Sequence, residues 1–108
     1  MNVEHALNPV AILYTWFHEN KQMFISCGAQ LEFKDSGRDS AYVRFETDFH
    51  IMELCAWNHS FCLDIQITEI ETENSEFLHA GSCESLEEFK EHLIRFFELF
   101  KVDFNRAR

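Results

Sequence analysis

Three residues near the middle of the chain have the side chains of a nucleophilic site. Cys62 could supply a thiolate, His59 a general base, and Asp64 a group that orients the histidine. On a strand, Cys62 and Asp64 would share one face, with His59 in the turn before them. A chain with four Cys and six His offers such trios by chance, so this one favours no enzyme. We expect no catalytic residue and keep an enzyme that uses Cys62 only as a third hypothesis.

Histidines and cysteines also offer ligands for a metal ion. The candidates are His50, His59, Cys62, His79 and Cys83, and His59-x-x-Cys62 is the closest pair. Their spacing matches no zinc finger or zinc ribbon, so it favours a turn histidine and a strand cysteine instead. The three glycines are isolated and form no phosphate-binding loop. We therefore expect no metal and no cofactor.

The charge of the chain is strongly negative and unevenly distributed. Its 108 residues have a net charge of −10, and no Lys or Arg occurs between Phe45 and Phe89. This balance argues against a nucleic acid backbone as a direct ligand, because such binding needs clustered cations. A surface of one sign speeds the encounter with a cationic partner, but like charge also keeps a protein soluble. Both readings stay open from the sequence alone.

Composition places the chain among folded intracellular proteins. It is 46% hydrophobic and contains 12 Phe, which a disordered chain would not. Its four cysteines form no C-x-x-C pair, the first residues lack a signal-peptide pattern, and no apolar run is long enough to span a membrane. We expect a single α+β domain over residues 1–108, a cytoplasmic location, free buried thiols and no contact with a membrane.

Helices are predicted at both ends. Asn8 and Pro9 form a helix start, and Val10, Leu13, Tyr14 and Phe17 share one face, so we predict a helix over about 9–20. Near the other end, Ser85-Leu86-Glu87-Glu88 is a capping box. The helix that it opens has an apolar stripe made of Leu86, Phe89, Leu93, Phe96, Phe97 and Phe100. We expect the tail, residues 102–108, to fray.

Five segments between the helices alternate apolar and polar residues, which predicts strands. They cover about 25–33, 41–46, 51–57, 61–68 and 76–80. Short turns between them predict an antiparallel meander sheet. Two amphipathic helices that pack on one face of this sheet would complete an α+β fold.

If both helices cover one face, the other face of the sheet stays open. We assign Met52, Leu54 and Ala56 to the covered face. The open face then carries Tyr42, Arg44, Glu46, Ile51, Glu53, Cys55, Trp57, Cys62, Asp64, Gln66 and Thr68. A slip of one residue in the third strand would bury Ile51, Cys55 and Trp57 instead, and the sequence leaves this alternative open.

Two features of this arrangement could bind a partner. Trp57, with Tyr42, could be an apolar anchor, although a strand Trp is also commonly buried. Carboxylates bracket the turn between the fourth and fifth predicted strands, and the repulsion within each close pair of them costs about 1 kcal/mol in a water-like dielectric. They either form a solvated loop or contact Lys and Arg of a partner. The candidate partner-binding residues are Tyr42, Glu53, Trp57, Asp64, Glu69, Glu71, Glu73 and Glu76.

The strand residues also resemble a known family. The stretches that carry the resemblance are Leu31–Phe33, Ala41–Phe45, Met52–Trp57, Leu63–Ile65 and Ser85–Phe89. They resemble the immunity proteins of bacterial contact-dependent growth inhibition, and most closely the group paired with toxins that cleave tRNA with the help of elongation factor Tu. The similarity spans most of the chain after residue 22.

The resemblance implies an antitoxin that binds a cognate nuclease domain and occludes its active site. The partner would be this toxin domain, in a complex that could also contain elongation factor Tu. The charge agrees, because a nuclease presents cations to phosphates and an acidic protein can occupy the same surface. The alternative is a small acidic adaptor or chaperone for a secreted effector.

Overall fold

The first helix of the chain is longer than its sequence pattern predicts. The computed structural model describes residues 8–35, 39–58 and 61–107, and its first element, α1, spans Pro9–Ser26. The side chain of Asn8 caps this helix, since its Oδ1 accepts from the Ala11 N–H at 2.7 Å. Tyr14, predicted on the buried face, is 49% exposed, whereas Phe24 is fully buried. The prediction that the helix ends near residue 20 is therefore wrong.

Gly28 determines where α1 ends. It has a φ of +87°, and its N–H donates to the Ile25 carbonyl at 2.9 Å, while the Ala29 N–H donates to the Phe24 carbonyl at 3.2 Å. These two bonds form a Schellman motif, which needs a left-handed residue and therefore favours glycine. Residues 25 and 26 are thus helical, and the predicted strand start at Ile25 is corrected to Gln30.

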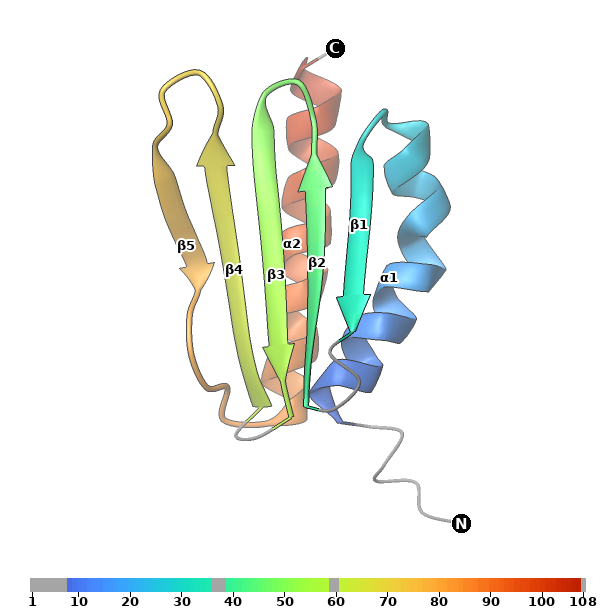
Figure 1. The fold of residues 1–108 in the computed structure, drawn as a ribbon, viewed down its shortest axis with the longest axis vertical. Helices are drawn as coiled ribbons and strands as arrows, with labels where there is room; N and C mark the ends of the chain where they lie inside the picture. The colour runs from blue at the N-terminus through green and yellow to red at the C-terminus, as the bar shows by residue number, and fades with distance from the viewer. Residues whose placement is uncertain (1–7, 36–38, 59–60, 108) are drawn as a thin grey trace.

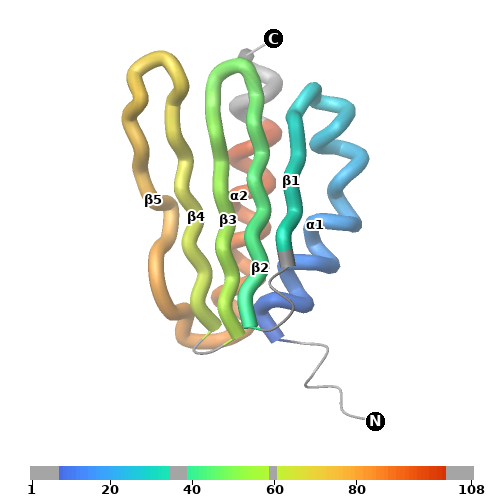
Figure 2. The backbone as a smooth tube through the Cα atoms, viewed as in Figure 1, coloured from blue at the N-terminus to red at the C-terminus, as the bar shows by residue number. Residues whose placement is uncertain are grey.

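The five strands form one antiparallel sheet whose spatial order follows the chain, as predicted (Figure 1). They are β1 (Gln30–Asp35), β2 (Ser40–Glu46), β3 (His50–Trp57), β4 (Cys62–Glu69) and β5 (Ser75–His79). Phe61, predicted within the fourth strand, instead lies in the turn before it with a φ of +49°. Figure 2 shows the backbone passing back and forth through the sheet before it enters the final helix.

The second helix, α2, spans Leu86–Ala107, so residues 102–107, which were expected to fray, are helical, and Arg108 lies outside the described residues. Ser85 Oγ accepts from the Glu88 N–H at 3.2 Å, as a capping box requires. The Glu88 carboxylate, however, accepts from the Glu84 N–H at 2.9 Å, one residue earlier than the usual box. Phe89, Leu93, Phe96 and Phe100 are buried, which confirms most of the predicted stripe. No helix among the described residues is long and apolar enough to cross a membrane.

Both helices pack on the same face of the sheet. The ring centroid of Phe45 in β2 lies 4.4 Å from the ring centroid of Phe24 in α1 and 5.7 Å from that of Phe96 in α2. One side chain points to only one face of its strand, so the two helices must share that face. In β3, Met52, Leu54 and Ala56 are buried. The alternative register, with Ile51, Cys55 and Trp57 buried, is excluded.

Candidate partner-binding surface

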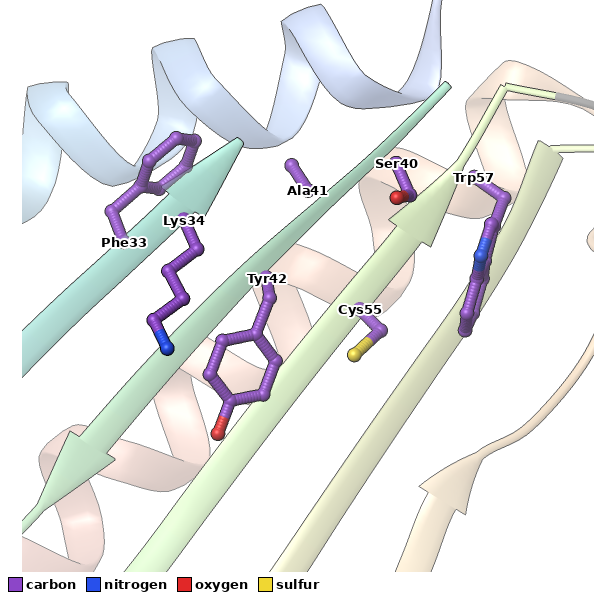
Figure 3. A pocket seen from close by; sticks show the side chains of 7 residues that line it. All are labelled: Phe33, Lys34, Ser40, Ala41, Tyr42, Cys55 and Trp57. Carbon is purple, nitrogen blue, oxygen red and sulfur yellow. The ribbon is translucent and has the colours of Figure 1, made fainter. Parts of the chain in front are cut away.

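The uncovered face of the sheet, here called the open face, is organised in rows by the strand register. Lys34 in β1 lies opposite Tyr42, Tyr42 lies opposite Cys55, and Cys55 lies opposite Asp64. Residues that oppose each other in antiparallel strands project to the same side. Figure 3 shows Lys34, Tyr42, Cys55 and Trp57 around a hollow on this face. The rings of Tyr42 and Trp57 line this hollow, so it could receive an apolar or aromatic group.

Tyr42 and Glu53 form the closest side-chain contact on the open face. The Tyr42 hydroxyl donates to Glu53 Oε2 at 2.6 Å across β2 and β3. Partial burial, followed by this hydrogen bond and the negative charge of Glu53, raises the pKa of Tyr42 well above its usual value. The phenol therefore stays protonated and positions the carboxylate.

The cations of the open face are paired with carboxylates of the same strand. Lys34 Nζ lies 3.8 Å from Glu32, and Arg44 donates to Glu46 at 2.9 Å. The latter hydrogen bond raises the pKa of Arg44. Since these cations already face carboxylates of their own strands, Glu53 and Asp64 are left to set the local charge. Asp64 Oδ1 accepts from the Gly81 N–H at 2.9 Å, which holds this carboxylate in place.

A second acidic surface lies at one end of the sheet, at the top of Figure 1, where the β2–β3 and β4–β5 turns meet. The Ile70 N–H donates to the Phe49 carbonyl at 2.9 Å and joins the two turns. Phe49 is 52% exposed and Ile70 is 39% exposed. We define the acidic tip as the exposed residues Asp48, Phe49, Glu69, Ile70, Glu71 and Glu73.

Backbone geometry explains why the acidic tip projects from the sheet. The Glu69 N–H donates to the Asn74 carbonyl and the Glu73 N–H to the Glu69 carbonyl, both at 2.8 Å. Glu73 closes the turn with a φ of +63°, which is unusual for a residue other than glycine. Among the described residues, the carboxylates of the tip take part in no ion pair.

The predicted binding residues fall into three places rather than one. Tyr42, Glu53, Trp57 and Asp64 lie on the open face, and Glu71 and Glu73 lie at the tip. Glu76 opposes Ile67, whose side chain packs against the core, so Glu76 projects toward the helix side. Glu69, at the base of the tip, also lines a hollow on that side together with Glu76 and His50.

Two exposed apolar groups of this surface were not among the predicted residues. Phe49 lies in a turn, and Phe77 is 56% exposed opposite Gln66 on the open face. An aromatic residue between charged ones in a turn is a weak signal that could have pointed to Phe49. The position of Phe77 depends on the β4–β5 register, in which Thr68 opposes Ser75 and Ile67 opposes Glu76, and the sequence does not reveal this register.

The residues considered for catalysis have structural partners. Cys62 Sγ lies 3.4 Å from Ser82 Oγ, and Asp64 accepts from the Gly81 backbone. His59 lies outside the described residues. All four cysteines are free, as expected, but only Cys83 is buried and the other three are partly exposed. Burial raises the pKa of Cys55 and Cys83. Cys62 and Asp64 share the open face through their i, i+2 spacing.

The residues considered for a metal are partly brought together. His79 Nε2 lies 4.0 Å from Cys83 Sγ, and Glu88 and His92 of α2 lie beside them. His50 lies in the hollow near the tip, and Cys62 lies on the open face. Sequence spacing did not suggest Glu88 or His92, since they are on a different element.

A small acidic α+β scaffold with an open sheet face, and with an acidic tip that forms no ion pair in the described part of the chain, has the features of a protein-binding module. A family model described as Immunity protein TriTu matches residues 11–99. The chain therefore belongs to the TriTu immunity protein family, whose name implies neutralisation of a cognate toxin. Such proteins are generally not enzymes. No curated protein and no solved structure matches the chain.

Proposed function

We propose that this TriTu immunity protein neutralises a tRNA-cleaving nuclease toxin of contact-dependent growth inhibition by occluding its active site. The observation that carries the proposal is the acidic tip. Its carboxylates are exposed, lie on two adjoining turns and take part in no ion pair within the described part of the chain. A nuclease must present cations to phosphates, and these carboxylates are their electrostatic complement.

The tip and the open face have different roles in this proposal. Carboxylates at the tip attract the nuclease over distances of about 10 Å, the Debye length at moderate salt. Glu53, Asp64, Glu69, Glu71, Glu73 and Glu76 pair with its Lys and Arg. Tyr42 and Trp57, on either side of the open-face hollow, receive apolar groups of the toxin. Covering the cationic site of the nuclease keeps tRNA away without any chemical step.

The proposal places the protein in the cytoplasm, where tRNA is cleaved. A toxin that acts with elongation factor Tu would be bound in a complex that contains this factor. The immunity protein would then contact the toxin domain, and the factor would stay on another surface of it.

A double charge reversal tests the role of the tip. We expect Glu71→Lys/Glu73→Lys to slow association with the nuclease domain of the cognate toxin by roughly tenfold at low salt and to flatten the salt dependence of this rate. Stopped-flow mixing at several salt concentrations measures this rate. Glu87→Lys/Glu91→Lys is the matched control, because it changes the net charge equally on exposed positions of α2, far from the tip. Equal slowing by both variants would remove the tip from the proposal.

The edge of the sheet supports a second candidate function, an adaptor or chaperone for a secreted effector. β5 is the last strand of the sheet, and Phe77 and Leu78 on it are exposed. Such an edge can add a strand from an extended peptide. Size-exclusion mass with each partner separates the two functions, because the adaptor would bind the effector's unfolded segment and not its folded nuclease domain.

A further inference from the structure

Four side chains with metal-binding atoms meet between the end of β5 and the start of α2. His79, Cys83, Glu88 and His92 each offer one ligand atom, and these atoms all lie within 4.8 Å of one another. His79 and His92 stack with ring centroids 4.1 Å apart. Cys83 is buried, and the other three are only partly exposed. This cluster lies away from the acidic tip, at the opposite end of the sheet.

Backbone contacts hold the segment that carries these groups. A bulge between β4 and β5 sets His79 opposite Ile65, so its ring points to the helix side. Leu63 donates to the Gly81 carbonyl at 2.9 Å, and Cys83 donates to the Phe61 carbonyl at 3.2 Å. Figure 2 shows this segment running under the lower end of the sheet into α2. The cluster is therefore built on fixed backbone.

The hydrogen bonds of two members leave a lone pair directed at the cluster. His79 Nδ1 lies 2.7 Å from the Leu63 carbonyl, which can only accept, so Nδ1 carries a proton and Nε2 is the ring atom that can offer a lone pair to a metal. A backbone carbonyl behind a histidine is the usual support of a metal ligand. Glu88 Oε1 accepts from the Glu84 N–H, which leaves Oε2 toward His79 at 3.8 Å and His92 at 3.2 Å.

We propose that His79, Cys83, Glu88 and His92 form a binding site for a zinc-type divalent transition metal ion. One thiolate, two imidazoles and one carboxylate are the ligand types that Zn²⁺ takes, whereas Mg²⁺ and Ca²⁺ prefer oxygen alone. Glu88 and His92 are four residues apart on one helix, so they face the ion from adjacent turns.

The distances are close to those of a tetrahedral site. Bond lengths of about 2.0–2.3 Å place nitrogen or oxygen ligands about 3.3 Å apart and a sulfur about 3.6 Å from a nitrogen. The observed separations are 3.2 Å for His92–Glu88, 3.8 Å for His79–Glu88 and 4.0 Å for Cys83–His79. The His92–Glu88 pair is already at ligand distance, and the other two pairs must close by roughly 0.4–0.5 Å. Since all four atoms lie within 4.8 Å of one another, the widest pair must close by at most about 1.5 Å, which side-chain rotation supplies.

The bound ion would join the end of β5 to the first turns of α2. Cys83 loses its proton to solvent on binding, since only the thiolate is a ligand. The Sγ–H bond is replaced by a metal–sulfur bond, and no redox change occurs. Four protein ligands leave no open position for substrate, so the ion has a structural role. The inference does not depend on the proposed toxin.

Cobalt titration of the reduced full-length chain tests the site. We expect one Co²⁺ per chain, with a sulfur-to-cobalt charge-transfer band and the intense visible bands of tetrahedral cobalt. Zn²⁺ should displace it and raise Tm by several degrees, as a ligand that binds only the folded state does. The absence of a sulfur-to-cobalt band, or of any Tm rise with Zn²⁺, would overturn the site.

Paired variants locate the ion. Cys83→Ala should abolish the charge-transfer band, while Cys55→Ala, on the open face, should keep it. His92→Gln should weaken Zn²⁺ binding at least about tenfold, measured by competition with a zinc-binding dye, while His50→Gln should not. Should Cys83→Ala fail to fold, Glu88→Gln replaces it, because its side chain can still accept from the Glu84 N–H. Wild-type affinity in both His92→Gln and Glu88→Gln would refute the assignment.

Discussion

Removal of one aromatic ring from the covered face should destabilise the protein far more than removal of the same ring from the open face. Phe45 in β2 is fully buried, and its ring contacts rings from both helices, among them Phe24 and Phe96. Phe45→Ala removes these contacts and leaves a cavity between the sheet and both helices. Such truncations cost about 3–5 kcal/mol of the free energy of unfolding. This is a large share of the roughly 5–15 kcal/mol that stabilises a domain.

Phe77→Ala is the matched control. Phe77 is also a strand phenylalanine, but it lies on the open face and is 56% exposed. Its truncation leaves no enclosed cavity, so we expect a change within about 0.5 kcal/mol.

Urea unfolding followed by tryptophan fluorescence measures both variants. Trp16 packs edge-on against Phe45 with centroids 6.2 Å apart, so it reports on this part of the core. With a urea dependence of about 2 kcal/mol per molar, a loss of 4 kcal/mol lowers the midpoint by roughly 2 M. A loss below about 1 kcal/mol in Phe45→Ala, or equal losses in the two variants, would refute the division of the sheet into a covered and an open face.

Two further predictions concern single contacts. Tyr42→Phe removes the hydrogen bond to Glu53 and should cost about 1 kcal/mol at neutral pH, low for a bond to a charged group because the pair is partly exposed. Because the pKa of Tyr42 is raised in the folded state, the tyrosine of the unfolded chain ionises first as pH rises past about 10, and the wild type loses free energy of unfolding there. Tyr42→Phe should lose less of this free energy over the same pH range. Urea unfolding at several pH values measures the difference, and equal pH dependence in the two proteins would contradict it. Gly28→Ala should lower the free energy of unfolding by about 1–2 kcal/mol. No atom crowds the new Cβ, but a φ of +87° strains any residue with an L side chain. An unchanged Tm would show that the Schellman motif does not end α1.

The sheet could be predicted from sequence because its strands alternate cleanly. In β4, Leu63 and Ile65 are buried while Asp64 and Gln66 are not, and a period of two has no helical equivalent. The end of α1 could not be placed by the same rule. Alternation from Ile25 onward imitates a strand, but tertiary packing buries Phe24, which continues the helical face of Phe17. Gly28 was the available signal, as a left-handed helix stop.

The candidate site was harder to predict than the sheet because it depends on strand register at the edge. The register next to the β4–β5 turn sets Phe77 opposite Gln66 on the open face, and the bulge beyond this pair turns His79 toward the helices. Sequence spacing could not connect His79 with His92, because the two residues lie on different elements and only the bulge turns His79 toward α2. The tip depends on the Ile70–Phe49 backbone bond, a contact between turns that local sequence does not encode.

In the proposed function, the two faces of the sheet separate stability from recognition. The large aromatic contacts lie on the covered face, where Phe24, Phe45 and Phe100 are fully buried. Residues of the open face and the tip contribute mainly partly exposed hydrogen bonds and charges, which are worth little to stability. Substitutions there can therefore change the partner at small cost to the fold. An immunity protein needs this property, since its binding surface must match one toxin while its scaffold stays the same.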